Sequence, residues 1–400
     1  MNKNKLSRKV SNYIKNIEPR LIKIRRDIHK HPEVAFEEYR TSEKIEEYLK
    51  DLDIEIKTGI GGTGITGLFS GNKNNSTIAL RADMDALNLQ EKNNKPYSSI
   101  NKGIMHACGH DGHIAILLGV AEVLNEIKEE LPGNVKLIFQ PAEEGIGGAQ
   151  PMIKEGVLKE PQIDAIFGLH IWLDLPSGTI GLKKGPAFAA IDEFDVNVKG
   201  ESAHGASPHQ GIDAITVSSS IIQSLQKIIS REIAPLDSGV ISIGKIEGGT
   251  KRNVIAENVK MEGTVRYLKK EMGELISEKV ENIVSSQCKA FGAEYKLDYY
   301  KNFPVLKNSE SLFSMVKKSA IETVGENAVQ ILDNPTMGGE DFAYFTQQVP
   351  GFFFFLGGRN EKKGITVPHH NPYFDFDEDI IIKGVEAFVN IILNYFSPYD

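Results

Sequence analysis

The chain has 400 residues, 40% hydrophobic and 25% charged, with a formal net charge of −8 at pH 7. This length allows two or three domains and at least one large core, and the acidic balance argues against nucleic-acid binding, which favours a basic surface. The two cysteines cannot form a disulfide framework, and the most apolar run, PGFFFFLGG, is too short to span a bilayer. The N-terminus has no signal-peptide core. We therefore expect a cytoplasmic protein that binds neither nucleic acid nor membrane.

The first half of the chain alternates between segments with helical and strand-like patterns. Apolar side chains recur at helical spacing within residues 18–50, where His31-Pro32 interrupts them. Later apolar runs are short and end at acids or at proline, as strands do. A strand, a helix and a strand in succession are typical of βαβ units in a largely parallel sheet. The expected strands begin at 76 and lie at 134–140 and 163–171, with a helix at 113–130.

The hydrophobic pattern changes near residue 190. Three segments then alternate at period two, which is typical of strands with one face in water, and two helical segments lie between them. From about residue 303 the chain returns to helix, buried strand and C-terminal helix. We predict an α/β domain of residues 1–190 and 304–400, into which a smaller α+β domain of residues 191–303 is inserted. The alternating strands are FDVNVKG, GVISIGKIEGG and VKMEGTVRYL, and the helices lie at 211–231 and 269–291.

The segment MHACGHDGH (105–113) holds one of the two cysteines among histidines. It precedes a predicted helix, in the kind of strand-to-helix loop where open α/β sheets bind ligands. Cys108 and His110 are one residue apart, and thiolate and imidazole are good ligands for Zn²⁺ and related ions. Three interpretations stay open: a metal site, a thiol nucleophile with its base, or a packed cysteine beside solvated histidines.

Three other segments place metal-ligating side chains at strand ends. Glu143 and Glu144 follow a strand, so one carboxylate could bind a metal ion while the other accepts a proton from water. His170 ends an apolar strand, and His370 belongs to a histidine pair before the last helix. Each alone has an ordinary explanation, as an acidic turn, a core histidine or a surface pair. Together with the cysteine they suit two ions roughly 3.5–4 Å apart, the spacing of two-metal hydrolases.

The combination of motifs resembles the M20 metallopeptidase family, and within it the amidohydrolase subfamily of N-acyl-amino-acid, hippurate and auxin-conjugate hydrolases. The resemblance covers nearly the whole chain, with its motifs in the same order. It implies a metal-dependent amidohydrolase that releases a free amino acid and a carboxylate from a small N-acyl amino acid. The motifs are HKHPEVAFEEYRT, ALRADMDALNLQE, MHACGHDGH, FQPAEEGIGGAQPMI, IFGLHIW, SAHGASPHQGIDA, GGTKRNVIAENVKMEGTVR, MGGEDFAYF and HHNPYFDFDED.

The resemblance also implies a set of metal ligands. Cys108 would bridge two divalent ions, a place that most of the wider family gives to aspartate. His110 and His170 would complete the first ion, and Glu144 and His370 the second. Zn²⁺, Mn²⁺, Co²⁺ and Ni²⁺ could all bind such ligands. The order of metal affinities alone does not decide which of these ions a protein holds in a cell.

Catalytic and substrate-binding roles follow from the same resemblance. Glu143 would be the general base. His204, in the inserted domain, matches a histidine that in relatives reaches the partner subunit's active site and stabilises the oxyanion, which implies a homodimer or a higher homo-oligomer. Asn253 and Arg266 match substrate-binding positions of that domain.

One departure from the wider family concerns the motif RADMDAL. Asp83 matches the acid of a His-x-Asp motif, but Arg81 stands at the histidine position. This departure is normal for the subfamily, where His110 supplies the missing imidazole. Asp83 would then contact the metal ligands rather than the metal ions. SAHGASPH and MGGEDF also differ from the commoner family sequences, and neither difference removes a ligand.

Other functions remain open from the sequence. The same fold could serve an exopeptidase acting on short peptides or an N-acetyl-diaminopimelate deacetylase. A non-catalytic protein with a structural metal is a third possibility, but structural zinc sites are normally closed by four protein ligands, and five candidates plus Glu143 favour an open site. A thiol hydrolase that uses Cys108 is a fourth, and inhibition by chelators rather than by alkylating agents would exclude it.

Overall fold

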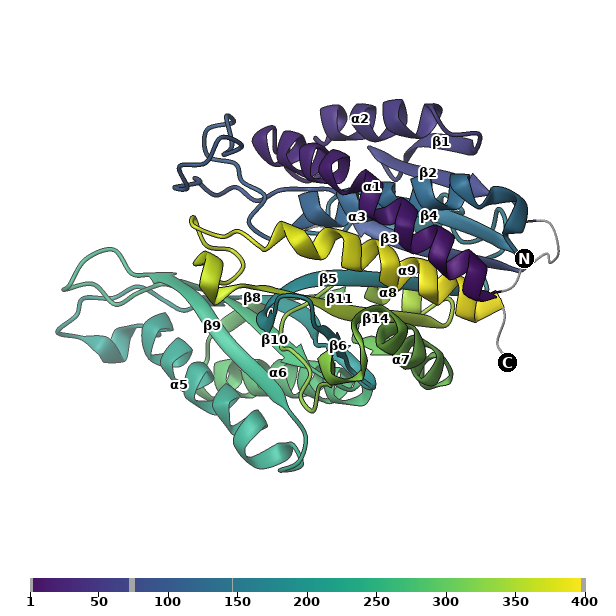
Figure 1. Ribbon diagram of the computed structural model, residues 1–400. Helices are drawn as coiled ribbons and strands as arrows, with labels where there is room; N and C mark the ends of the chain where they lie inside the picture. Colours follow the sequence, from purple (N-terminus) through teal and green to yellow (C-terminus); the bar gives the residue numbers. More distant parts are fainter. Residues whose placement is uncertain (1–2, 72–75, 146, 397–400) are drawn as a thin grey trace. The chain divides into compact units, whose positions relative to one another are not determined.

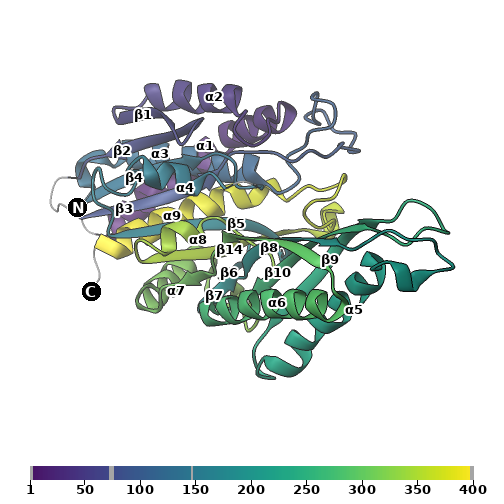
Figure 2. The same ribbon diagram turned by 180° about the vertical axis from the view of Figure 1, so that it is seen from behind.

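The computed structural model describes residues 3–71, 76–145 and 147–396, and the chain divides into two compact units (Figure 1, Figure 2). Unit 1 contains the helices and strands of both ends of the chain. Unit 2 is formed mainly by one continuous stretch from the middle of the chain. Unit 1 comprises Met1–Ala187, Lys307–Asn334 and Asp341–Asp400, and unit 2 comprises Phe188–Leu306 and Pro335–Glu340.

Unit 1 is built on an eight-stranded mixed sheet. Its strands, in spatial order, are β1 (Glu55–Ile60), β2 (Gly64–Phe69), β4 (Asn134–Gln140), β3 (Thr77–Asp83), β5 (Ala165–Pro176), β14 (Gly351–Arg359), β6 (Ile180–Leu182) and β13 (Val329–Ile331). The central strands β4, β3, β5 and β14 run parallel, whereas β1, β2 and β6 pair in antiparallel fashion. Every residue of β3 is buried, as expected for a parallel strand covered on both faces. The strand predicted at 134–140 is β4.

Helices cover both faces of this sheet. Nearly all of α3 is buried, because α1 and α9 pack on its outer side and strands β3, β4 and β5 lie beneath it. Figure 2 shows α4 and α8 on the side seen from behind. Within the described residues, every helix is too short or too polar to cross a lipid bilayer. The helices are α1 (Lys3–Lys30), α2 (Tyr39–Lys50), α3 (His110–Glu126), α4 (Ala149–Lys154), α7 (Glu310–Val324), α8 (Ala343–Thr346) and α9 (Ile381–Phe396), with short turns at Lys128–Glu130, Glu326–Ala328, Glu361–Lys363 and Glu378–Ile380.

Unit 2 has an antiparallel sheet and two long helices, as the alternating sequence pattern predicts, but the sheet has a fourth strand, β11, beyond the three predicted. In spatial order the strands are β11 (Glu294–Phe303), β8 (Ala190–Lys199), β10 (Asn258–Tyr267) and β9 (Gly239–Gly248). Apolar side chains of the sheet pack against α5 (Ala214–Lys227), which a short π-helix (Ile228–Glu232) extends, and against α6 (Lys270–Phe291). A short 3₁₀ turn (Pro208–Gln210) precedes α5. Strands β7 (Gly185–Phe188) and β12 (Leu306–Asn308) form a separate two-stranded sheet.

The predicted fold class, an α/β domain with a smaller α+β domain, is confirmed.

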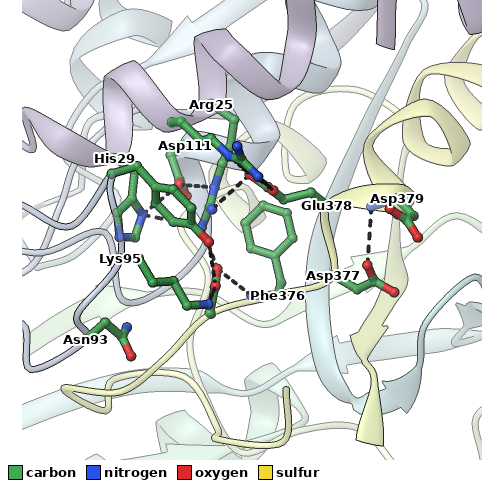
Figure 3. A network of polar contacts seen from close by, with 12 residues as sticks. Arg25, His29, Asn93, Lys95, Asp111, Phe376, Asp377, Glu378 and Asp379 are labelled. Carbon is green, nitrogen blue, oxygen red and sulfur yellow. Dashed lines mark hydrogen bonds and ion pairs between the residues drawn. The ribbon is translucent and has the colours of Figure 1, made fainter. Parts of the chain in front are cut away.

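A buried arginine links α1 to α3 and to the segment before α9. Arg25 Nε lies 2.6 Å from Asp111 Oδ2, and the Nη atoms lie 2.8 Å from Asp375 Oδ1 and 3.2 Å from Glu378 Oε1. Figure 3 shows Arg25 with Asp111, Glu378 and the ring of Phe376, whose centroid is 4.4 Å from the guanidinium. Because Asp111 lies in the first turn of α3, this ion cluster fixes the end of α3 that follows MHACG.

We predict that Arg25→Met lowers the free energy of unfolding of unit 1 by about 3–5 kcal/mol, because removal of one buried partner leaves uncompensated charges. Urea unfolding can be followed by the fluorescence of Trp172, the single tryptophan, which lies in β5 of unit 1. Arg26→Met is the matched control: Arg26 binds the same Glu378 but its side chain is 47% exposed, so the expected loss is about 0–1 kcal/mol. Equal losses in the two variants would contradict the prediction.

Candidate metal centre and active site

The loop before α3 presents two of the predicted ligands. Gly109 separates Cys108 from His110 and has a φ of 90°, in the left-handed region that glycine adopts without strain. This turn lets α3 begin at His110. The thiol of Cys108 and a ring nitrogen of His110 both lie within 4.8 Å of a ring nitrogen of His170, which projects from β5.

Two groups of three side chains share Cys108. The ligand atoms of Cys108, His110 and His170 all lie within 4.8 Å of one another, and so do those of Cys108, Glu144 and His370. The Cys108 Sγ is 3.4 Å from His170 Nε2, and His370 Nε2 is 3.1 Å from Glu144 Oε1. The structure therefore brings the five predicted ligands together as two triads with one common thiol.

Backbone carbonyls orient the two histidines of the first triad. His110 Nδ1 lies 2.9 Å from the carbonyl oxygen of Asp85, and His170 Nδ1 lies 2.6 Å from that of Ile171. A carbonyl can only accept, so each Nδ1–H donates and each Nε2 faces the cluster. His110 Nε2 is buried and has no hydrogen-bond partner among the described residues. Metal-binding histidines usually have this arrangement, with the second ring nitrogen held by a carbonyl or carboxylate.

The electrostatics of the cluster show a shortage of positive charge. Burial, followed by Glu144 and Glu143, raises the pKa of the Cys108 thiol well above its ordinary value. Burial lowers the pKa of His110, but the nearby acids, Asp83 first, more than offset this and raise it to about 10. The acids thus disfavour a thiolate and favour an imidazolium. Divalent cations would supply the missing charge, so the donor set fits metal ions.

The backbone is strained beside the two glutamates and at the last ligand. Glu143 and Glu144 follow β4, and a carboxylate oxygen of each lies within 4.8 Å of a ring nitrogen of His110. Ala142 has a φ of 54° and His370 a φ of 59°, values that are uncommon for residues other than glycine. Such conformations cost energy and gather at functional sites, where the surroundings hold them in place.

Asp83 lies behind the ligands, at the end of β3. Its Oδ2 lies 2.7 Å from Arg81 Nη1, and its Oδ1 lies 2.6 Å from His113 Nδ1. Burial would raise the pKa of Asp83, but His110, His113 and Arg81 outweigh it and hold the pKa well below its usual value. Arg81 also lies 2.9 Å from Asp341, so this guanidinium joins two buried acids. The carboxylate of Asp83 therefore stays charged and accepts from His113.

Two further histidines, His113 and His369, bind the backbone N–H and carbonyl of Ile171, the residue after His170. The Ile171 N–H donates to His113 Nε2 at 2.9 Å, and His369 Nε2 donates to the Ile171 carbonyl at 2.8 Å. Sequence reasoning assigns neither histidine a role. Two features of the sequence point to them. His113 lies three residues after His110 on one helix, so both lie on the same face, and His369 directly precedes His370.

The remaining predicted residues belong to unit 2. His204 and Asn253 are exposed and lie in two adjoining loops, joined by a bridge between His204 and Val254 and by a 2.8 Å bond from the Gly205 N–H to the Asn253 carbonyl. Arg266 lies on β10, half-buried, and burial lowers its pKa. The roles predicted for His204, Asn253 and Arg266 stay predictions.

Four of the five donors are buried or half-buried, whereas the His370 side chain is 55% exposed, so the donor set is open on one side. The chain belongs to peptidase family M20/M25/M40, whose model matches residues 79–394. Thermostable carboxypeptidase 2 of Saccharolobus solfataricus is 41% identical over 396 residues, which cover 98% of this chain and 99% of the relative. N-acetyl-L-cysteine deacetylase of Bacillus subtilis is 40% identical over 372 residues, covering 93% and 87%.

A solved structure also supports the classification. The YXEP protein of Bacillus subtilis, described as a dinuclear metal binding peptidase from the M20 family, has a TM-score of 0.84 at 35% sequence identity, over 96% of this chain and 99% of its own. The predicted family is therefore confirmed, and the protein is a hydrolase of this family.

Proposed function

We propose that the protein is a metal-dependent amidohydrolase that cleaves N-acyl amino acids into a free amino acid and a carboxylate. The observation that carries the proposal is the sharing of the Cys108 thiol by two ligand triads, with Glu143 beside them. The similarity to N-acetyl-L-cysteine deacetylase supports an N-acyl substrate. A carboxypeptidase activity is the second candidate, because thermostable carboxypeptidase 2 is as similar in sequence.

We assign Cys108 as the ligand common to two ions, which could be Zn²⁺, Mn²⁺, Co²⁺ or Ni²⁺. His110 and His170 would complete the first ion, and Glu144 and His370 the second. Bound divalent ions would act as Lewis acids toward the amide carbonyl and would lower the pKa of a water molecule. The donor types support this assignment, since thiolate, imidazole and carboxylate all bind such ions.

Glu143 is assigned as the proton carrier. Its carboxylate would accept a proton from the attacking water and deliver it to the leaving amine nitrogen. The side chain is largely buried but lies beside the ligand triads, within 4.8 Å of His110 and Glu144. Its neighbour Glu144 would bind metal, so two adjacent glutamates have different roles.

A substrate panel tests the proposed function. N-acetyl, N-benzoyl and indole-acetyl amino acids should be hydrolysed in the presence of divalent metal and protected from hydrolysis by a chelator. Dipeptides, and peptides with a free carboxyl terminus, are the comparison substrates. Hydrolysis of the peptides alone would favour the carboxypeptidase, and hydrolysis of neither class would contradict both candidates.

We predict that Cys108→Ala lowers the amount of zinc or manganese bound per chain, together with turnover, because both triads lose their common ligand. Metal content is measured by mass spectrometry of dialysed protein. Cys288→Ala is the matched control, since Cys288 is also a buried free cysteine but lies on α6 of unit 2. A Cys108→Ala protein with the metal content of Cys288→Ala would rule out the shared-ligand role.

We predict that Glu143→Gln leaves the metal content close to that of the wild type but lowers kcat by about 100-fold or more, the size of a general-base contribution. Glu144→Gln should instead lower metal affinity, because it removes a ligand. Metal titration and steady-state kinetics on the same preparations separate these effects. Equal loss of metal in both variants would show that the two roles have been assigned wrongly.

We also propose a homodimer formed through unit 2. Strand β9 lies at the edge of its sheet, and an unpaired edge can pair with another chain. Val240 and Ile246 on this strand are 38% and 52% exposed, and Ile215 on α5 is 50% exposed. In such a dimer, the exposed loop of His204 would serve the partner's active site, where the imidazole would stabilise the oxyanion.

Mixing two inactive variants tests this arrangement. Glu143→Gln and His204→Ala subunits, dissociated and reassociated together, should recover activity, because one site of each mixed dimer contains both intact groups. Each variant treated in the same way alone is the control. Verified mixed dimers without recovered activity, or a wild-type enzyme that is active as a monomer, would exclude the role of His204 in the partner's site.

A cytoplasmic setting is part of the proposal. Cys108 and Cys288 are both free in the structure, and a reducing compartment preserves free thiols. Oxidation of Cys108 would remove the ligand that the two triads share.

A further inference from the structure

Three consecutive backbone amides of the glutamate loop donate to buried carboxylates. The Ala142 N–H lies 2.9 Å from Glu38 Oε1, the Glu143 N–H lies 3.0 Å from Asp85 Oδ1, and the Glu144 N–H lies 2.9 Å from Asp85 Oδ2. Glu38 and Asp85 are 0% and 1% exposed. Successive N–H groups directed at an anion form a stable backbone arrangement, so these two carboxylates hold the loop that follows β4.

Only a charged carboxylate can make both contacts that Asp85 makes. Each of its oxygens accepts from a different amide, and those amides belong to neighbouring residues, Glu143 and Glu144. An amide side chain of the same shape has one oxygen and one NH₂ group, which cannot accept. With asparagine at this position, one of the two backbone N–H groups would face another donor.

Asp85 also holds a third group of the candidate site. Its backbone carbonyl accepts from His110 Nδ1 at 2.9 Å, which directs His110 Nε2 into the metal-binding cluster. One residue, placed just after β3, therefore fixes His110 through its carbonyl and both Glu143 and Glu144 through its carboxylate.

We propose that Asp85 is a positioning residue for this reaction: its carboxylate sets the relative placement of the proton carrier Glu143 and the ligand Glu144. Ala142, the residue before Glu143, has a strained φ of 54°, and such a conformation persists where the surrounding groups hold it in place. This inference rests on the proposed function for the roles of the two glutamates. The two hydrogen bonds from the Glu143 and Glu144 amides to Asp85 can be tested without metal or substrate.

The test is Asp85→Asn, compared with the wild type in three measurements. Hydrogen–deuterium exchange of the metal-free protein should be faster in the peptide that contains residues 142–144. Metal affinity should fall by about 10–100-fold, as is usual when the group that orients a ligand is lost. At saturating metal, kcat should fall by about 100-fold with a much smaller change in KM, since a displacement of about 1 Å at a reacting group has that effect.

Glu38→Gln is the matched control, because it makes the same carboxylate-to-amide exchange at the same loop. Glu38 Oε1 accepts the Ala142 N–H, and Oε2 accepts the Thr63 hydroxyl at 2.5 Å. Glutamine can keep its oxygen on Ala142 and turn its NH₂ toward Thr63, whose hydroxyl also accepts. All three measurements should therefore change far less than in Asp85→Asn.

Unchanged exchange at 142–144 in Asp85→Asn, or kcat and metal affinity close to those of Glu38→Gln, would overturn the proposal. A lower melting temperature with exchange, metal affinity and kcat preserved would also overturn it, since that is the result of a purely structural role. If Asp85→Asn does not fold, Asp85→Ser is measured in its place. A wild-type protein that neither binds metal nor hydrolyses amides would refute the proposed function, whereas the exchange measurement would still decide whether Asp85 holds the loop.

Discussion

The concentration of buried negative charge where β3 and β4 end is the constraint on which the rest of this site depends. Asp83 and Asp341 both form ion pairs with Arg81, and Asp85 accepts hydrogen bonds from backbone amides. Burial and the neighbouring glutamates raise the pKa of the Cys108 thiol well above its ordinary value. Divalent cations bound at the ligand cluster would offset this negative charge and favour the thiolate.

The sheet topology explains why these groups meet. Strands β4, β3 and β5 are parallel neighbours, so the loops that follow β3 and β4 leave the same edge of the sheet. Asp85 lies in the first loop and the glutamates in the second, which places a carboxylate beside two backbone amides. The start of α3 is held from the opposite side by the Arg25–Asp111 ion pair. Residues more than a hundred positions apart in sequence are thereby fixed around one thiol.

The sequence predicted the strands that have a continuous apolar run or a period-two alternation. Strand β4 matches its predicted range, and β14 is a continuous apolar run, whereas β1 and β11 are polar and give no such pattern. In the site, the residue types of Cys108 and Glu144 were enough to predict them as candidate metal ligands. The resemblance to the M20 family then assigned them to particular ions. The role of Asp85 could not be predicted, because it depends on which backbone amides the tertiary structure brings to its carboxylate.

Arg81 stands where the wider family has a histidine, and a series of hydrogen bonds connects it to the metal-binding cluster. With His110 and His113, its guanidinium holds the pKa of Asp83 well below the usual value. Asp83 accepts from His113 Nδ1, which leaves His113 Nε2 to accept the Ile171 N–H. The Ile171 carbonyl in turn accepts from His170 Nδ1, so that His170 Nε2 faces Cys108. A cation at position 81 therefore acts on the metal-binding cluster through four successive hydrogen bonds.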